Sequence, residues 1–173
     1  MASFHRILSK CDRALVAYLT ARNVGQPGQV LPAKRSGDKN LPLIICYSHV
    51  YLVLRNTGAY TVQASILIKS SMVIEVGAEE TTARSASDEM VGAVIDALWT
   101  IDDDSGWDSK KLAGQVTAAA RGQAMADPTN ADLADFTAFD VRHMGGSSGV
   151  LDDLHAWTET VDLEIDCAPA NVD

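Results

Sequence analysis

The chain has 173 residues, of which 47% are hydrophobic, and its 23 acidic and 14 basic residues give a formal net charge of −9. This length suits one domain with a real core, and the hydrophobic fraction excludes a fully disordered chain. The longest apolar runs, such as residues 41–47, fall far short of the roughly 18 residues needed to span a bilayer. We therefore expect one globular domain over residues 1–173, with no membrane partner.

The acidic and basic residues are divided unequally along the chain. Residues 1–74 contain nine basic and two acidic residues, a net charge of +7, whereas residues 75–173 contain five basic and 21 acidic residues, a net charge of −16. Such a split is typical of proteins that bind nucleic acid or another charged partner. It also fits a domain whose halves attract each other, or a subunit whose basic surface meets the acidic surface of a neighbour.

The first half of the chain predicts one helix followed by three strands. Apolar residues at helical spacing indicate a helix over about 4–22: Ile7, Cys11, Ala14, Leu15, Tyr18 and Leu19. A short strand is expected at 29–34, followed by a polar turn at 35–40. Residues 43–54 are apolar on both faces, which indicates an interior strand, and residues 60–69 alternate as a half-buried strand does.

Two helices and an acidic loop are predicted next. A capping-box pattern at Ser85–Asp88 indicates a helix that begins there and runs to about residue 99. Asp108 is a candidate N-cap for a further helix over residues 109–123, whose apolar stripe is thin. Residues 126–135 are interpreted as an acidic loop.

The last part of the chain predicts two strands around a glycine-serine loop. The first covers residues 136–144, with Phe139 and Val141 on one face, and the loop covers 145–149. The final strand, 155–167, alternates between an apolar face and a face with a row of carboxylates: Asp162, Glu164 and Asp166. Such a row needs water or basic partners, because like charges along it repel.

The order of these elements is helix, three strands, two helices and two strands. Runs of strands and helices in this order predict an α+β fold rather than alternating βαβ units. We expect a mainly antiparallel sheet of about five strands, with two to three helices packed on one face.

The loop at 145–149 matches the G-x-S-x-G motif of serine hydrolases, in which Ser147 would be the nucleophile. That motif requires a sharp turn between a strand and a helix, with an acid and a histidine from separate elements. Here Asp152, Asp153 and His155 follow within eight residues of Ser147, and a strand is predicted after them. We expect no catalytic residue, and a small serine hydrolase using Ser147 is only a distant alternative.

No metal or cofactor site is expected from the sequence. The run Asp102–Asp104 lacks the alternating ligands and terminal Glu of an EF-hand loop. The four histidines form no close pair at metal-ligand spacing: His5, His49, His143 and His155. No phosphate-binding glycine motif is present either, so nucleotide binding has no support.

The three cysteines and a small basic loop complete the list of candidate sites. Cys11, Cys46 and Cys167 are far apart with no C-x-x-C pair, which is neither a disulfide framework nor a zinc pattern and favours a reduced, intracellular chain. The basic loop has no interleaved aromatic residues, so it suits a solvated turn or a protein contact better than nucleic acid: Lys34, Arg35 and Lys39. A nucleic-acid-binding module therefore remains a weaker alternative.

Five segments carry a resemblance to a known family. They are the helix CDRALVAYLTARN, the strands LPLIICYS and YTVQASILIKSS, the helix SDEMVGAVIDALW and the closing segment FTAFDVRHMGGSSGVLDDLHAWTETVDLEIDCAP. In this order they resemble the tail terminator proteins of tailed bacteriophages, also called tail completion or tail-to-head joining proteins. The resemblance covers most of the chain, and residues 101–135, the least family-like part, are interpreted as a variable acidic insert.

The resemblance implies a structural role in the virion and no catalysis. Such proteins form a ring, usually a hexamer, on the head-proximal end of the tail tube, where they stop polymerisation and dock to the head connector. The implied partners are copies of the chain, the tail tube protein and head connector or neck proteins, with DNA passing through the lumen without sequence-specific binding. The implied location is the tail or neck of the virion, after assembly in the host cytoplasm. Another neck component, such as a head-completion or connector protein, is the nearest alternative.

A ring of identical subunits uses interfaces in which one patch meets a different patch on the neighbour. The basic first part and the acidic second part of the chain could supply those two patches. Alternatively, the acidic row of the last strand could face the lumen and repel phosphate, or be the solvent face of an exposed sheet. Candidate contact segments are 34–40, 101–135 and 145–154, and the candidate interface or lumen residues are Lys34, Arg35, Lys39, Asp162, Glu164 and Asp166.

Overall fold

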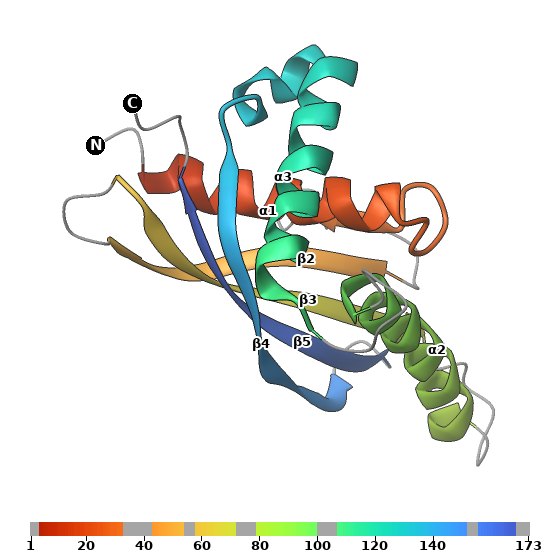
Figure 1. Cartoon of the computed structure of the whole chain (residues 1–173). Coiled ribbons are helices and arrows are strands. Elements are labelled where there is room, and N and C mark those ends of the chain that lie inside the picture. Colours follow the sequence, from red (N-terminus) through yellow and green to blue (C-terminus); the bar gives the residue numbers. More distant parts are fainter. Residues whose placement is uncertain are drawn as a thin grey trace.

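The structure is a computed structural model that describes residues 4–32, 43–53, 58–71, 79–99, 107–151 and 156–168. They form a five-stranded sheet with helices, so the predicted α+β fold is confirmed (Figure 1). In chain order the elements are α1 (Phe4–Ala21), β1 (Val30–Pro32), β2 (Leu43–Val53), β3 (Tyr60–Ser71), α2 (Glu79–Trp99), α3 (Ser109–Ala126), the 3-10 helix η2 (Pro128–Leu133), β4 (Thr137–Leu151) and β5 (Ala156–Ala168).

The sheet is mixed and has the strand order β1-β2-β3-β5-β4. Only β1 runs parallel to its neighbour β2, and the other neighbours pair antiparallel. β2 lies between β1 and β3, as its two apolar faces predict. The centre of the sheet is the long antiparallel pair of β3 and β5, in which Val62 lies opposite Ile165.

One face of the sheet is covered by helices and contains the core. The apolar stripe predicted for α1 is buried there, together with residues of α2 and α3. Alternate residues along residues 62–68 of β3 and 161–167 of β5 point into this core: Val62, Ala64, Ile66, Ile68, Val161, Leu163, Ile165 and Cys167. Figure 1 shows α1 beside β2 and α3 beside β4, and each helix contacts that strand. Among the described residues, no helix is long and apolar enough to cross a membrane.

Helix α2 begins earlier than the capping-box pattern predicts. It starts at Glu79, so Ser85–Asp88 lies inside the helix and does not cap it. The core contacts come from the second half of α2, where Val94 and Leu98 are fully buried.

Helix α3 begins where the sequence predicts. The Asp108 carboxylate accepts hydrogen bonds from the backbone N–H groups of Lys110 and Lys111, which is an N-cap. The thin stripe packs closely, since its large and small members are both buried: Leu112, Ala113, Val116, Thr117 and Ala120. The predicted acidic loop that follows instead contains η2, because the Asp127 side chain caps its first turn and Leu133 is fully buried.

Strand β4 is longer than predicted. Residues 145–149, interpreted as a flexible loop, lie within it and pair with β5. A Cβ on Gly146 would collide with the carbonyl oxygen of Thr160, so the close approach of the two strands requires a glycine. Gly145 has a φ of +112°, a conformation that other residues rarely adopt. The glycines that suggested a loop therefore serve the pairing of two strands.

A bulge in β4 also changes the predicted orientation of Phe139. The register with β5 shifts between Ala138 and Asp140, so Phe139 is an extra residue and is 49% exposed. Val141 is fully buried, so the two side chains do not share a face as expected. A single extra residue reverses the alternation that sequence patterns rely on.

Candidate functional site

The candidate site is the face of the sheet opposite the three helices. We call it the polar face, and its charged and polar side chains are Thr61, Gln63, Ser65 and Lys69 on β3, Asp162, Glu164 and Asp166 on β5, and Asp140 and Arg142 on β4. The register places Thr61 opposite Asp166, Gln63 opposite Glu164 and Ser65 opposite Asp162. The predicted orientation of the carboxylate row, away from the apolar side of β5, is therefore confirmed.

Arg142 lies at the centre of the charged part of this face. Its Nη1 is 2.5 Å from Asp140 Oδ2 and 2.9 Å from Asp166 Oδ2, and its Nη2 is 2.6 Å from Glu164 Oε1. Hydrogen bonds to Asp166 and then to Glu164 raise the pKa of Arg142 above its ordinary value. One guanidinium thus holds three carboxylates, which supplies the basic partner that the row requires.

Two hydroxyl groups of β3, on the other side of β5 from Arg142, donate hydrogen bonds to carboxylates of the same row. Thr61 Oγ1 donates to Asp166 Oδ1 at 2.6 Å, and Ser65 Oγ donates to Asp162 Oδ1 at 2.6 Å. Burial acts to raise the pKa of Asp166, but hydrogen bonds from Arg142 and Thr61 outweigh it and hold the pKa below its usual value. In the described part of the chain, Asp162 has its hydrogen bond from Ser65 and no ion pair.

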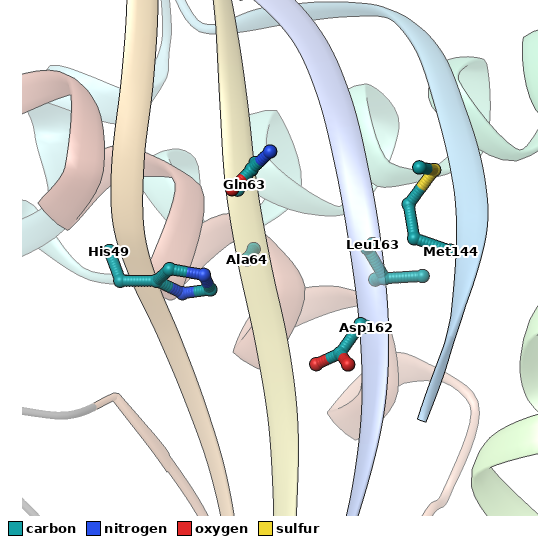
Figure 2. A pocket seen from close by; sticks show the side chains of 6 residues that line it. All are labelled: His49, Gln63, Ala64, Met144, Asp162 and Leu163. Atoms are coloured by element: carbon teal, nitrogen blue, oxygen red, sulfur yellow. The ribbon is translucent and has the colours of Figure 1, made fainter. Parts of the chain in front are cut away.

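A hollow of about 240 Å³ lies beside Asp162 and is lined by six residues, His49, Gln63, Ala64, Met144, Asp162 and Leu163 (Figure 2). Figure 2 shows the His49 ring extending from β2 toward β3, Met144 on β4, and Gln63 and Asp162 on the two strands between them, with the helices behind the strands. The lining therefore combines an imidazole, an amide, a carboxylate and a thioether from four different strands.

Two β-bulges place the side chains at the ends of this hollow. The register of β2 shifts between Ser48 and Val50, which makes His49 the extra residue, and that of β4 shifts between His143 and Gly145, which makes Met144 the extra residue. Both bulges lie at the level of the Ala64–Leu163 pair, because Ala64 pairs with Ser48 and Leu163 pairs with His143. Bulges redirect side chains, and here they do so on both sides of the central strand pair.

Two of the catalytic arrangements considered from the sequence can be compared with the described residues. Within the described ranges, no three His, Cys, Asp or Glu residues are placed to hold a metal ion. Ser147 lies inside strand β4 and shares a 2.9 Å hydrogen bond with Thr160 Oγ1, whereas the hydrolase motif needs a turn between a strand and a helix. Its proposed partners, Asp152, Asp153 and His155, lie outside the described residues.

The structure brings together only half of the predicted interface residues. Asp162, Glu164 and Asp166 share the polar face, but the basic loop lies outside the described residues: Lys34, Arg35 and Lys39. Residues 101–106 and 152–154 of the other candidate segments lie outside them too, as does the Asp102–Asp104 run. The described remainder of the acidic segment is folded, since α3 and η2 contribute to the core.

Sequence reasoning missed the residues that complete the site. Arg142 could have been found by pairing the last two strands antiparallel, because the register then puts it opposite Glu164. Ser65 and Thr61 follow in the same way from the alternation of their strand. His49 and Met144 carry no such signal, because a bulge is recognised only from the register with the partner strand.

Comparison of the chain with models of known protein families finds no match, and comparison with curated proteins finds none either. The case for a function therefore depends on the geometry of this chain and on the resemblance of its sequence. Among the described residues, that geometry is a sheet with helices on one face and a charged, polar surface on the other.

Proposed function

We propose that the protein is a structural subunit of a tailed bacteriophage, a tail terminator that forms a ring at the head–tail junction. It caps the tail tube, stops polymerisation and presents a docking surface to the head connector. Five segments of the sequence support the proposal, and the observed order of α1, β1 to β3, α2, α3, β4 and β5 agrees with the order on which that resemblance depends.

The polar face carries this proposal, as the surface through which a subunit contacts protein. Its four carboxylates outnumber its two cations among the described residues, so it favours a basic surface on the partner: Asp140, Asp162, Glu164, Asp166, Arg142 and Lys69. It stands on the central strands β3 and β5, whose other face is fixed in the core. Rigid placement lowers the entropy lost on docking.

Two exposed apolar side chains favour a protein interface over a wall that only faces DNA. Phe139 and Met144 are 49% and 58% exposed, and both are bulge residues of β4, an edge strand of the sheet. Large apolar side chains among polar ones are typical of protein interfaces, in which aromatic residues and Met are enriched. We therefore assign the polar face to a contact between protein subunits, with a basic surface of the neighbouring subunit as its complement.

The proposal is tested by the lengths of tails made without this protein. A genome with the gene deleted is expected to produce overlong tails without heads, measured by electron microscopy of negatively stained lysates. Tails of normal length joined to heads would overturn the proposal. The alternative of another neck component predicts that the protein is found on heads that lack tails, which immunolabelling of heads from a tail-deficient mutant that still makes the protein can show.

The serine hydrolase alternative has its own test in Ser147→Ala. We expect normal assembly in complementation and no esterase activity in the natural chain, because the Ser147 hydroxyl lies within a strand and shares a hydrogen bond with the Thr160 hydroxyl. A loss of esterase activity on substitution would favour the hydrolase instead.

A further inference from the structure

The fold brings two cysteines from opposite ends of the chain into contact. Cys11 on α1 and Cys167 on β5 are separated by 156 positions in the sequence, and their sulfur atoms lie 3.5 Å apart. Both thiols are free and both side chains are fully buried. The sequence could not indicate this pair, because spacing alone showed no cysteine motif. The third cysteine, Cys46, is also free and fully buried, on β2.

The contact arises from two independent patterns. Cys11 belongs to the apolar stripe of α1, and Cys167 belongs to the alternation that points Ile165 and Leu163 into the core. A disulfide has a sulfur–sulfur distance of about 2.0 Å, so these two atoms must approach by roughly 1.5 Å. Rotation about the Cα–Cβ bond is the motion that moves a cysteine sulfur, and a change of rotamer displaces it by more than this distance.

We propose that Cys11 and Cys167 form a redox-modification site, at which hydrogen peroxide or a small disulfide such as oxidised glutathione converts the two thiols into one intramolecular disulfide. With peroxide, one sulfur attacks a peroxide oxygen and breaks the O–O bond, which gives a sulfenic acid and one water. The second sulfur then attacks the sulfenic sulfur and releases a second water. Two thiols and one hydrogen peroxide thus give one disulfide and two waters. With oxidised glutathione, one cysteine sulfur displaces one glutathione and forms a mixed disulfide, and the second cysteine sulfur then displaces the other, which gives one intramolecular disulfide and two reduced glutathiones.

The same contact makes the reaction slow in the folded chain. The hydrogen bond with Cys167, followed by burial, raises the pKa of Cys11 well above its ordinary value, so little of the reactive thiolate exists at neutral pH. Access requires local opening, which is expected most readily at the end of β5, where Cys167 is the last residue but one. Cys11 lies farther from an end of its element, as the eighth of the 18 residues of α1. We therefore expect the rate to become independent of oxidant concentration once opening limits it.

The disulfide would close a loop that contains nearly the whole chain. Closing a loop of this length removes much conformational freedom from the unfolded state, which stabilises the folded one. A subunit that assembles in a reducing cytosol would then be locked after release into oxidising surroundings. This consequence depends on the proposed function, but the pairing of the two thiols does not.

The test uses the full-length chain, purified reduced and then treated with hydrogen peroxide or oxidised glutathione. Intact mass should fall by two hydrogens, and the free thiols counted after denaturation should fall from three to one. Peptide mapping without reductant should link the peptides of Cys11 and Cys167. The melting temperature should rise by about 5–15 °C, given a typical disulfide in a chain of this size.

Matched variants separate this pair from general oxidation. Cys11→Ala and Cys167→Ala should each abolish the mass change, whereas Cys46→Ala should keep it, although all three thiols are equally buried. A product that links Cys46 or joins two chains would overturn the proposal.

If the folded chain does not react, the pairing of the cysteines is measured after the chain is refolded in a glutathione buffer. The Cys11–Cys167 bond should exceed each other pairing at least tenfold, and an even mixture of the three pairings would contradict the inference.

Discussion

The two faces of the same sheet are stabilised in different ways. The helix-covered face buries aliphatic side chains almost completely, and each contributes about 1.5–3 kcal/mol to stability. The polar face relies on partly exposed ion pairs such as those of Arg142, and such pairs contribute about 0–1 kcal/mol each. Folding therefore depends mainly on one face, which leaves the other able to serve contact with a partner. Substitutions on the two faces should separate these roles.

The largest difference is expected between two positions of β3. Ile66→Ala, on the covered face, removes a fully buried side chain and should lower the free energy of unfolding by about 2–5 kcal/mol. Gln63→Ala, on the polar face, should change it by less than about 0.5 kcal/mol, because the side chain is exposed. Urea unfolding followed by circular dichroism measures both. Equal losses would show that the two faces do not differ as described.

A smaller loss is expected where β4 approaches β5. Gly146→Ala places a Cβ against the carbonyl of Thr160, and we expect a loss of about 1–3 kcal/mol as the strands separate. Gly149→Ala is the matched control, since its Cβ would meet no atom within 4 Å. The same unfolding measurements apply. If both substitutions cost the same, the close approach at Gly146 is not what requires a glycine there.

The Arg142 cluster should matter less and should respond to pH. Arg142→Met leaves three carboxylates without their shared cation and should cost about 1 kcal/mol at pH 7, given their partial exposure. Because the folded pKa of Asp166 lies below its unfolded value, its contribution is full above about pH 4 and is lost as the pH falls through the folded pKa. The difference between the natural chain and the variant should therefore shrink in acid.

Unfolding measured from pH 7 to pH 3 tests this dependence. Arg121→Met removes an exposed arginine whose hydrogen bond is to the uncharged Thr137, so it should show no such trend with pH. A loss from Arg142→Met that stays constant over this range would mean that the carboxylates do not depend on the guanidinium. Added salt should reduce the loss at pH 7, because partly exposed charges are screened.

The features that the sequence predicts correctly are those with a local cause. The α1 stripe, the Asp108 cap and the alternation of β5 each depend on residues within one segment. The glycines at 145–149 misled the prediction because glycine usually ends a strand, and only the neighbouring strand shows why it is needed there. The carboxylate row of the site was predicted correctly because the alternation of a single strand, β5, places those side chains on one face.

The remaining features depend on how distant segments pair. Arg142 reaches Glu164 because of the register between β4 and β5. His49 and Met144 frame the hollow because two bulges fall at the same level, and a bulge has no local signature. The contact of Cys11 with Cys167 joins positions 156 apart. No periodicity within a segment carries such information.

The most direct test of the central claim is Gln63→Arg, which places a long cationic side chain in the hollow of the polar face without reaching the core. In complementation of a genome that lacks the gene, the variant should fold with unchanged stability but fail to yield joined heads and tails, counted by electron microscopy. Met125→Arg is the control, since its side chain is 86% exposed on α3, and it should assemble normally. Normal numbers of joined particles with Gln63→Arg would contradict the assignment of the polar face to subunit contact.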